Sequence, residues 1–181
     1  MIHPTFFDPK NSTNLFGLKK NLIFLQQLYN KQKLPKVLML TGKKGSGKST
    51  LTNHFLFSIF DNKNYDFKNF RLIDNSNFIN QFRSNIFPNI IYLKGSDYKS
   101  VKIEDIRELK MKISKSAILN RDRFIVLDDV EVFNLNSLNA LLKLIEEPGD
   151  KNFFFLINNK TRPLIETIKS RSIEINILLN E

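Results

Sequence analysis

The chain has 181 residues, and 28 Lys or Arg against 18 Asp or Glu give it a formal net charge of +10. This length suits one domain with a sizeable core and leaves no room for a large second domain. The sequence contains no Cys and only two His residues, which lie far apart along the chain. These counts exclude disulfides, thiolate zinc sites and cysteine nucleophiles, and they argue against a metal site built on histidine.

No uncharged run approaches the ~20 residues that a membrane span needs, and the N-terminus lacks the apolar core of a signal peptide. We therefore expect a cytoplasmic protein with no membrane partner. The positive charge favours anionic partners such as nucleic acid or nucleotides. A composition bias is the alternative explanation, since Lys, Asn, Ile and Phe are all abundant, as an AT-rich genome would produce.

The first part of the chain leads up to a strand. Residues 1–14 are polar and include two prolines, so we expect an extended lead-in. A helix is predicted from Lys19 to about Lys31, because apolar residues recur along one side of it. Pro35 ends that connection, and the run of apolar residues at 37–40 then predicts a buried parallel strand.

A phosphate-binding loop follows this strand, because Gly42 to Ser49 fit the pattern G-x-x-x-x-G-K-[ST] at every fixed position. Glycine allows such a loop to wrap a phosphate with its own N–H groups pointing inward. Lys48 supplies a positive charge for the outer phosphates, and the Ser49 hydroxyl is a ligand for Mg²⁺. Apolar residues at helical spacing over 51–59 predict a helix whose N-terminus faces the phosphates. The predicted nucleotide-binding residues are Gly42, Lys43, Lys44, Gly45, Ser46, Gly47, Lys48, Ser49 and Thr50.

The stretch over 61–88 has the weakest pattern, and it predicts only a strand near 70–73 and a helix near 76–84. Beyond it, residues 90–93 predict a short strand. Residues 100–115 carry apolar side chains along one face of a predicted helix, and the basic residues of this helix are best explained as its solvated outer face.

The second feature with chemical meaning is the pair Asp128 and Asp129, which directly follows the apolar run 124–127. This run predicts a strand buried on both faces, and ligands bind at the carboxyl ends of such strands. Asp128 is then placed to hold the water shell of Mg²⁺, and Asp129 to orient the attacking water. The alternative is that the acidic pair only begins a turn.

The last third of the chain continues the alternation of strands and helices. A helix over 134–147 is ended by a Pro-Gly pair, and a buried strand at 153–157 follows. Asn158, at the end of this strand, is a candidate for contact with the γ-phosphate or the attacking water, with a simple Asn turn as the alternative. A short helix over 163–169 and a strand over 173–177 come next. This order predicts an α/β fold, with a doubly wound parallel sheet of five strands and helices on both faces.

Two segments carry a resemblance to a known family. The residues 137–148, S-L-N-A-L-L-K-L-I-E-E-P, are similar to the N-A-L-L-K-x-x-E-E-P segment of DNA polymerase clamp loaders, and Ser170-Arg171-Ser172 resembles their S-R-C motif. With the phosphate loop and the acidic strand end, the likeness covers most of 15–177. The chain resembles the N-terminal AAA+ ATPase modules of the bacterial DNA polymerase III delta prime subunits. The related gamma/tau subunits usually carry a K-Y-R-P-like stretch, where this chain has D-P-K-N at 8–11.

The resemblance implies a P-loop NTPase of the AAA+ type. It would bind ATP and Mg²⁺ through Lys48, Ser49 and Asp128, with Asn158 as a sensor of the γ-phosphate. Arg171 would act as an arginine finger in the site of a neighbouring subunit, with a surface arginine before an edge strand as the alternative. The implied partners are the other clamp-loader subunits in a hetero-oligomer, the sliding clamp, and primed DNA contacted through its backbone.

Some parts of the family pattern are missing. The sequence shows no zinc module, helical lid or C-terminal collar, so we expect a single nucleotide-binding domain over 1–181 and no zinc. The family usually has Glu where this chain has Asp129, and delta prime subunits are often poor or inactive ATPases. A nucleotide-binding scaffold without turnover is therefore one alternative function. A small P-loop kinase is the other, since this length is typical of that class, although no compact lid rich in arginine is evident over 61–121.

Overall fold

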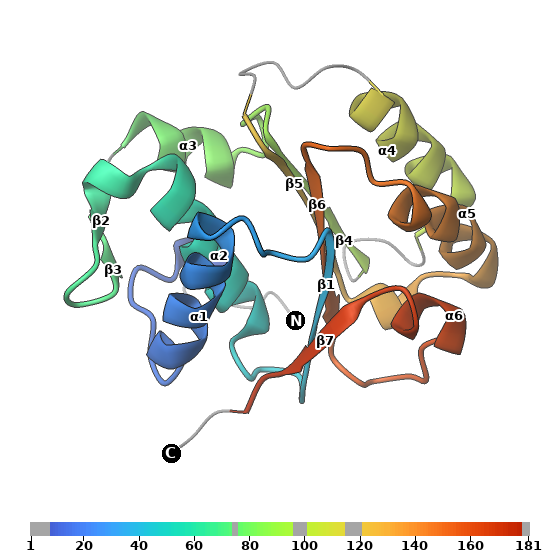
Figure 1. Cartoon of the computed structure of the whole chain (residues 1–181), viewed down its shortest axis with the longest axis horizontal. Helices are drawn as coiled ribbons and strands as arrows, with labels where there is room; N and C mark the ends of the chain where they lie inside the picture. The colour runs from blue at the N-terminus through green and yellow to red at the C-terminus, as the bar shows by residue number, and fades with distance from the viewer. Residues whose placement is uncertain (1–7, 74–75, 96–100, 115–120, 179–181) are drawn as a thin grey trace. The chain divides into compact units, whose positions relative to one another are not determined.

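The computed structural model of the chain describes residues 8–73, 76–95, 101–114 and 121–178 (Figure 1). The chain divides into two compact units, and each is described by itself. The sheet unit contains Pro35–Lys44 and Pro88–Ile177, and the helical unit contains the described parts of Met1–Leu34, Gly45–Phe87 and Leu178–Glu181.

The helices and strands follow one another in an alternating order. They are η2 (Pro9–Asn11), α1 (Lys19–Asn30), β1 (Val37–Thr41), α2 (Lys48–Phe60), η3 (Asn62–Asn64), β2 (Tyr65–Asp66), β3 (Arg71–Leu72), α3 (Asn77–Arg83), β4 (Ile90–Lys94), α4 (Ile103–Ser114), β5 (Arg123–Asp128), η5 (Val130–Val132), α5 (Leu135–Glu146), β6 (Asn152–Asn158), α6 (Glu166–Lys169) and β7 (Ile173–Asn176).

The sheet unit is built on five parallel strands in the order β4-β5-β6-β1-β7. The three central strands β5, β6 and β1 are dominated by apolar residues, nearly all of them buried. Continuous apolar runs of this kind suit strands that are covered on both faces. The predicted five-stranded parallel sheet is therefore confirmed.

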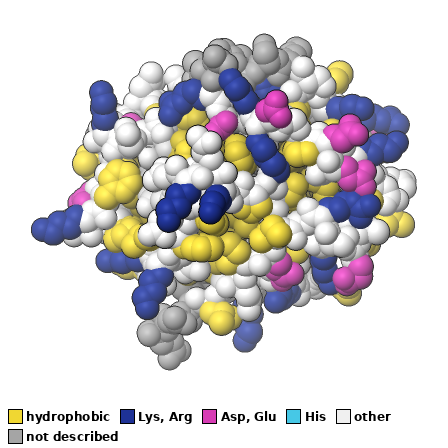
Figure 2. Space-filling view, viewed as in Figure 1, with side chains coloured by type: hydrophobic (Ala, Val, Ile, Leu, Met, Phe, Trp, Pro, Cys, Tyr) yellow, Lys and Arg dark blue, Asp and Glu magenta, His cyan; other side chains and the backbone are white. Residues whose placement is uncertain are grey.

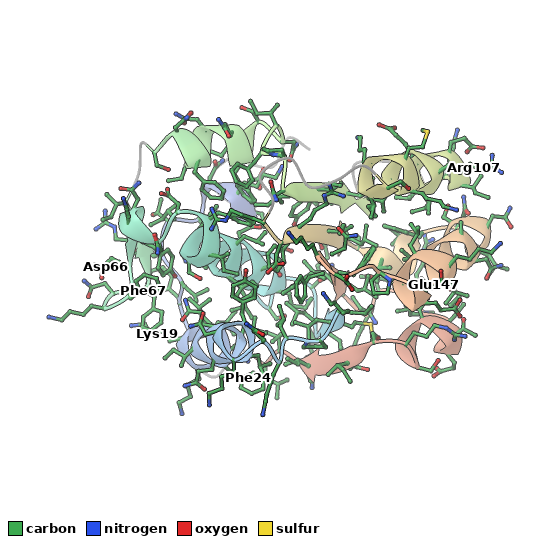
Figure 3. All side chains as sticks on the ribbon, turned by 45° about the horizontal axis from the view of Figure 1, so that its top comes forward. Lys19, Phe24, Asp66, Phe67, Arg107 and Glu147 are labelled. Atoms are coloured by element: carbon green, nitrogen blue, oxygen red, sulfur yellow. The ribbon has the colours of Figure 1, made fainter. Side chains whose placement is uncertain are left out.

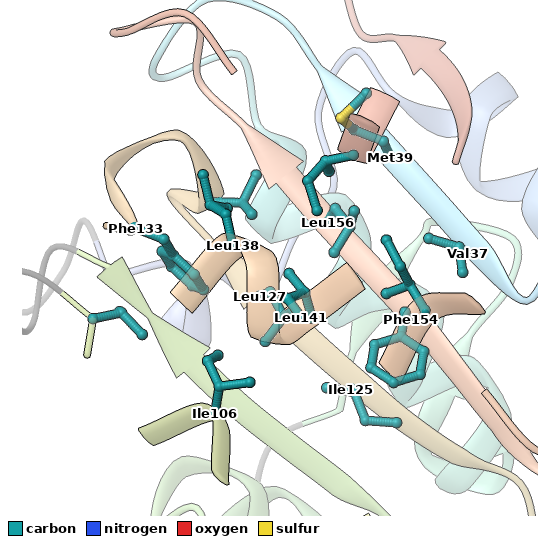
Figure 4. Close-up of a cluster of buried hydrophobic side chains, with 14 of the residues drawn as sticks. Val37, Met39, Ile106, Ile125, Leu127, Phe133, Leu138, Leu141, Phe154 and Leu156 are labelled. Atoms are coloured by element: carbon teal, nitrogen blue, oxygen red, sulfur yellow. The ribbon is translucent and has the colours of Figure 1, made fainter. Parts of the chain in front are cut away.

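Helices α4, α5 and α6 lie together on one face of this sheet (Figure 1). Their apolar side chains form one cluster with alternate residues of the strands, and Figure 4 shows Ile106 of α4 and Leu141 of α5 in this cluster with Ile125 of β5. The strand residues that point to the opposite face, such as Val126 and Phe155, are also 0% exposed. Both faces of the sheet are buried, as the apolar runs predicted.

Polar or acidic side chains mark the starts of helices α5 and α4 in the sheet unit. Asn134 precedes α5, and its Oδ1 accepts a hydrogen bond from the backbone N of Ser137 at 2.8 Å. Glu104 and Asp105 lie in the first turn of α4, where carboxylates interact favourably with the helix dipole. Both helices lie within the predicted ranges, and positions 100 and 115 lie outside the described residues.

The helical unit contains α1, α2, α3 and the hairpin of β2 and β3. Phe57 of α2 packs edge-to-face against Phe78 and Phe82 of α3, with ring centroids 5.9 and 4.8 Å apart. Ser76 caps α3, because its Oγ accepts a hydrogen bond from the backbone N of Ile79 at 3.1 Å. The helices predicted over 19–31 and near 76–84 are thus confirmed. None of the helices in the described ranges is both long and apolar enough to cross a membrane.

The start of the helical unit differs from the sequence-based expectation. Residues 1–7 lie outside the described residues. The lead-in is not extended throughout, because Asp8 caps a single 3-10 turn and its Oδ1 accepts a hydrogen bond from the backbone N of Lys10 at 2.9 Å. The expected strand near 70–73 exists, but it pairs antiparallel with β2 in a sheet of its own. Asp66 closes that hairpin by accepting hydrogen bonds from the backbone N atoms of Lys68 and Asn69.

The short helix predicted over 163–169 begins late. Helix α6 starts at Glu166, and Ile165 before it has an extended backbone. Leu164 is 4% exposed and belongs to the core cluster of the sheet unit. The apolar packing of Leu164 therefore explains why the prediction was wrong at this end.

Candidate functional site

The phosphate-binding loop connects β1, which ends at Thr41, to α2, which begins at Lys48. Gly45 and Gly47 have φ values of 84° and 80°, a conformation that residues with a Cβ rarely adopt. A Cβ at position 47 would also lie 2.8 Å from Leu18 Cδ1. The loop thus has the backbone that its glycine spacing predicted.

The N-terminus of α2 has the features of an anion site. The helix has 13 residues, starts directly after Gly47 and carries no side-chain cap. The N-terminal N–H groups and the dipole of such a helix favour a negative charge. Lys48 is 2% exposed, and its Nζ donates a hydrogen bond to Ser46 Oγ at 3.1 Å. The loop therefore holds a positive charge among its own residues.

The start of the loop lies at the carboxyl edge of the sheet, beside β6. Thr41 pairs with Asn158 in the ladder of β1 and β6, and the backbone N of Gly42 donates to Asn158 O at 3.3 Å. Since β5 pairs with β6 in parallel, its end at Asp128 lies at the same edge. The strand order thus brings Asp128, Asp129 and Asn158 to the edge where the loop begins.

The carboxylate of Asp128 is buried and fixed in orientation. It is 3% exposed, its Oδ2 accepts a hydrogen bond from Tyr92 Oη at 2.9 Å, and its Oδ1 accepts one from the backbone N of Asp129 at 2.9 Å. Tyr92 reaches it because it pairs with Val126, whose side chain points to the same face as Asp128. A fixed carboxylate at a strand end is suited to a hard cation such as Mg²⁺.

Asp129 occupies a tight turn. Its φ is 56°, in the left-handed region, and its Oδ1 accepts a hydrogen bond from Asn159 Nδ2 at 2.6 Å. The turn also needs a glycine at position 95, because a Cβ there would lie 2.8 Å from Asp129 O. The acidic pair therefore begins a turn, as the alternative explanation held, and this turn fixes the second carboxylate at the strand end.

Asn158 also takes part in a turn. Its Oδ1 accepts a hydrogen bond from the backbone N of Lys160 at 2.9 Å, which is the Asn turn considered as the alternative. Its position beside Thr41 is nevertheless the one predicted, because β6 lies between β5 and β1.

Arg171 lies away from the other residues that were predicted to form the site. It precedes β7, which runs parallel to β1 with Ile173 paired to Leu38, so it lies at the amino edge of the sheet. Its Nε donates to Glu146 Oε1 at 2.6 Å, and its Nη1 donates to Thr167 O at 3.0 Å. The sheet unit therefore places Arg171 at the edge opposite to Asp128 and Asn158.

Sequence analysis did not single out Tyr92, Asn159 or Glu131. Glu131 is 4% exposed, and its Oε1 accepts a hydrogen bond from Thr161 Oγ1 at 2.8 Å. The sequence offered only weak indications of these residues. Tyr92 is the polar member of an apolar run, and Asn159 directly follows Asn158, which was predicted as a site residue.

A family model described as DNA polymerase III, delta subunit, matches residues 17–180. The chain belongs to this family. The DNA polymerase III subunit delta' of Pseudomonas aeruginosa is 33% identical over 76 residues, which cover 42% of this chain and 23% of that protein. The DNA polymerase III subunit tau/gamma of Haemophilus influenzae is 23% identical over 175 residues, which cover 93% of this chain and 24% of that protein. The resemblance to clamp-loader modules is thereby confirmed, and the matches span less than a quarter of these relatives' length.

Comparison with solved structures gives a fold that is consistent with membership of the DNA polymerase III, delta subunit family. A DNA polymerase III gamma subunit-related protein from Thermotoga maritima has a TM-score of 0.64 at 17% identity, covering 87% of this chain and 46% of that one. The RuvB Holliday junction branch migration motor of the same organism has a TM-score of 0.56 at 18% identity, covering 94% of this chain and 48% of that one. The predicted fold class, an AAA+ P-loop NTPase, is confirmed.

Proposed function

We propose that this chain is the ATPase module of a DNA polymerase III clamp-loader subunit, which acts through bound ATP and through contact with neighbouring subunits. The observation that carries the proposal is a complete phosphate loop that begins at the sheet edge where β5 ends in Asp128, in a chain of the delta subunit family. The names of the delta' and tau/gamma relatives support a place in DNA replication.

The residues of the loop fit a nucleoside triphosphate with Mg²⁺. Gly45 and Gly47 give the loop the backbone that points N–H groups at phosphates, and Lys48 adds the positive charge. The Ser49 hydroxyl and the Asp128 carboxylate would hold Mg²⁺ together with phosphate and water oxygens. No group of three or more His, Cys, Asp or Glu within the described ranges could hold a metal ion. The cation would accordingly arrive with the nucleotide. The bond to be hydrolysed would be a phosphoanhydride bond of that nucleotide.

Turnover depends on Asp129 and Asn158. Asp129, oriented by Asn159, would position the attacking water, and Asn158 would respond to the γ-phosphate from its place beside Thr41. Aspartate reaches less far than the glutamate usual in the family, so we expect hydrolysis to be slow. A nucleotide-binding scaffold without turnover is the second candidate, favoured by the 2.6 Å hydrogen bond that already occupies the Asp129 carboxylate. Family membership favours both over a small kinase.

Arg171 would serve a neighbouring subunit. Since it lies at the amino edge of its own sheet, opposite to Asp128, its guanidinium would reach a nucleotide only across a subunit interface. This role requires a hetero-oligomer of clamp-loader subunits, with the sliding clamp and primed DNA as further partners. Contacts to the DNA would be to its backbone and independent of sequence.

Calorimetric titration of the full chain with ATP and Mg²⁺ tests the nucleotide site. We expect saturable binding, and at least roughly tenfold weaker binding by Lys48→Ala, because the substitution removes the charge that faces the outer phosphates. Lys63→Ala removes an exposed lysine outside the loop and should bind like the unchanged chain. Circular dichroism would show that each variant is folded. No binding by the unchanged chain, or equal binding by Lys48→Ala, would overturn the proposed site.

A further inference from the structure

A groove of ≈ 400 Å³ runs between α4 and α5 of the sheet unit. The two helices lie side by side in both ribbon views, and Figure 3 labels Arg107 on α4. The residues that line the groove include Ile103, Arg107 and Lys110 from α4 and Ala140, Lys143 and Leu144 from α5. None of them belongs to the proposed nucleotide site or contacts Arg171.

The groove follows both helices for about two turns. Ile103, Arg107 and Lys110 are spaced four and three residues apart, and residues with this spacing share one face of a helix. At 1.5 Å per residue, the seven-residue span from 103 to 110 corresponds to roughly 10 Å along the helix axis. A groove of this length between two helices matches two turns of a third helix laid against them.

The floor of the groove is apolar. Ile106 at its base is 1% exposed and belongs to the core cluster. Ile103, Ala140 and Leu144 are partly exposed, so their apolar surfaces remain accessible to a ligand. Covering such surface with apolar side chains is favourable, whereas a sugar-phosphate backbone offers nothing comparable to bury there.

The rim of the groove is positively charged. Arg107, Lys110 and Lys143 are exposed, and the groove-lining residues that the structure describes include no Asp or Glu. Within the described ranges, the ammonium groups of Lys110 and Lys143 make neither a hydrogen bond nor an ion pair. Arg107 Nη1 lies 4.0 Å from Glu104 Oε1, with both side chains 68% exposed, which makes this a weak pair. The rim thus offers three cations to an acidic partner.

We propose that this groove binds an acidic amphipathic helix of a partner protein. The apolar side of that helix would lie on Ile103, Ala140 and Leu144, and its carboxylates would face Arg107, Lys110 and Lys143. Apolar contact on the floor provides affinity, and the charged rim fixes the orientation and speeds the encounter. The inference goes beyond the proposed function, because this binding requires no nucleotide.

The test uses the full chain and a synthetic peptide of about 15 residues, long enough to form a helix on the surface, with Leu along one helical face and Glu elsewhere. We expect saturable binding by fluorescence anisotropy and shifts of the methyl NMR signals of Ile103 and Leu144. Lys110→Glu/Lys143→Glu should weaken binding at least roughly tenfold, because it reverses the charge of the rim. Lys112→Glu/Lys169→Glu is the matched control and should leave binding unchanged, since these lysines pair with Glu108 and Glu166 outside the groove.

Three results would overturn the proposal. A peptide of scrambled sequence that binds as tightly would show that only charge is recognised. A DNA oligonucleotide that shifts the same methyl signals, when the peptide does not, would assign the groove to nucleic acid. Absence of methyl shifts with the peptide would show that the groove does not receive a helix.

Discussion

At the scale of single residues, Arg171 is the predicted site residue whose surroundings most restrict its role. Its Nε lies 2.6 Å from Glu146 Oε1, in an ion pair whose side chains are 38% and 45% exposed. Both residues belong to the two segments that carry the family resemblance. If Arg171 serves a neighbouring subunit as proposed, a nucleotide there must compete with this carboxylate for the guanidinium, so Glu146 would control how readily the arginine is presented.

We expect Glu146→Gln to raise the steady-state ATPase rate of the assembled complex roughly several-fold, whereas Arg171→Ala should lower it by about 10³-fold or more. The loss of an exposed ion pair should change the free energy of unfolding by no more than about 1 kcal/mol. Glu147→Gln is the control, because the neighbouring glutamate is exposed and is not the ion-pair partner of Arg171. A slower Glu146→Gln complex would mean that the ion pair positions the arginine productively.

His54 makes stability depend on pH. It is 0% exposed, and burial lowers its pKa from 6.5 to about 4, although the hydrogen bond to Ser12 O raises it slightly. Because a carbonyl only accepts, Nε2 carries the proton, and Nδ1 accepts from Tyr65 Oη at 2.8 Å. The folded state therefore keeps His54 neutral over a pH range in which the unfolded chain protonates it.

Stability should consequently be full above the unfolded pKa of 6.5 and fall as the pH drops from there toward 4. When the pH falls from 7.5 to 5.5, we expect His54 to lower the free energy of unfolding by about 1.3 kcal/mol. Urea denaturation at each pH measures this change. His54→Gln should be less stable at neutral pH and should lose this pH dependence. An equal decline in the variant would assign the effect to other groups.

At the scale of elements, Ser137 joins the start of α5 to the residue at position 101, ahead of α4. Its Oγ is buried and donates to Val101 O at 2.7 Å. Ser137→Ala should lower the free energy of unfolding by about 1–3 kcal/mol, because it leaves a buried carbonyl without this donor. Ser114→Ala removes a similar but exposed hydrogen bond to Lys110 O and should cost less than about 0.5 kcal/mol. Equal urea midpoints for both variants would contradict this assignment.

Elements with a strong residue pattern could be predicted with their bounds, whereas those with a weak pattern were placed only approximately or were missed. Helix α5 has an Asn cap, an apolar stripe and a proline after its end, so its bounds followed from the sequence. Strand β3 was expected near 70–73, but its partner β2 was not, because a strand of two residues is too short to show any periodicity. The late start of α6 depends on the burial of Leu164, which only the packed core reveals.

Some residues of the candidate site could likewise be predicted from the sequence, and others could not. The phosphate loop could be placed from its local motif, and Asp128 from the apolar run that directly precedes it. Tyr92 and Asn159 contact the acidic pair from strands far apart in the sequence, so their roles depend on the order and register of β4, β5 and β6. No local pattern contains that information.

At the scale of the whole molecule, the net charge of +10 bears on the proposed contact with DNA. Lys and Arg side chains are spread over the surface seen in Figure 2, with fewer acidic ones among them. A spread of cations suits contact with a phosphate backbone, where affinity comes from the release of counterions and carries no sequence preference. We therefore expect weak binding to a primed duplex that depends on salt and is indifferent to base sequence.

If the chain contacts four phosphates, raising the salt from 50 to 200 mM should weaken DNA binding by about 100-fold. The slope of log K against log salt is about −0.9 per phosphate contact. Fluorescence anisotropy with two primed duplexes of unrelated sequence measures both properties. The Lys110→Glu/Lys143→Glu variant, with a charge of +6 after two reversals, should retain most of the slope if its groove receives a peptide rather than DNA. Binding that is insensitive to salt would show that the excess of Lys and Arg serves no nucleic acid and reflects composition alone.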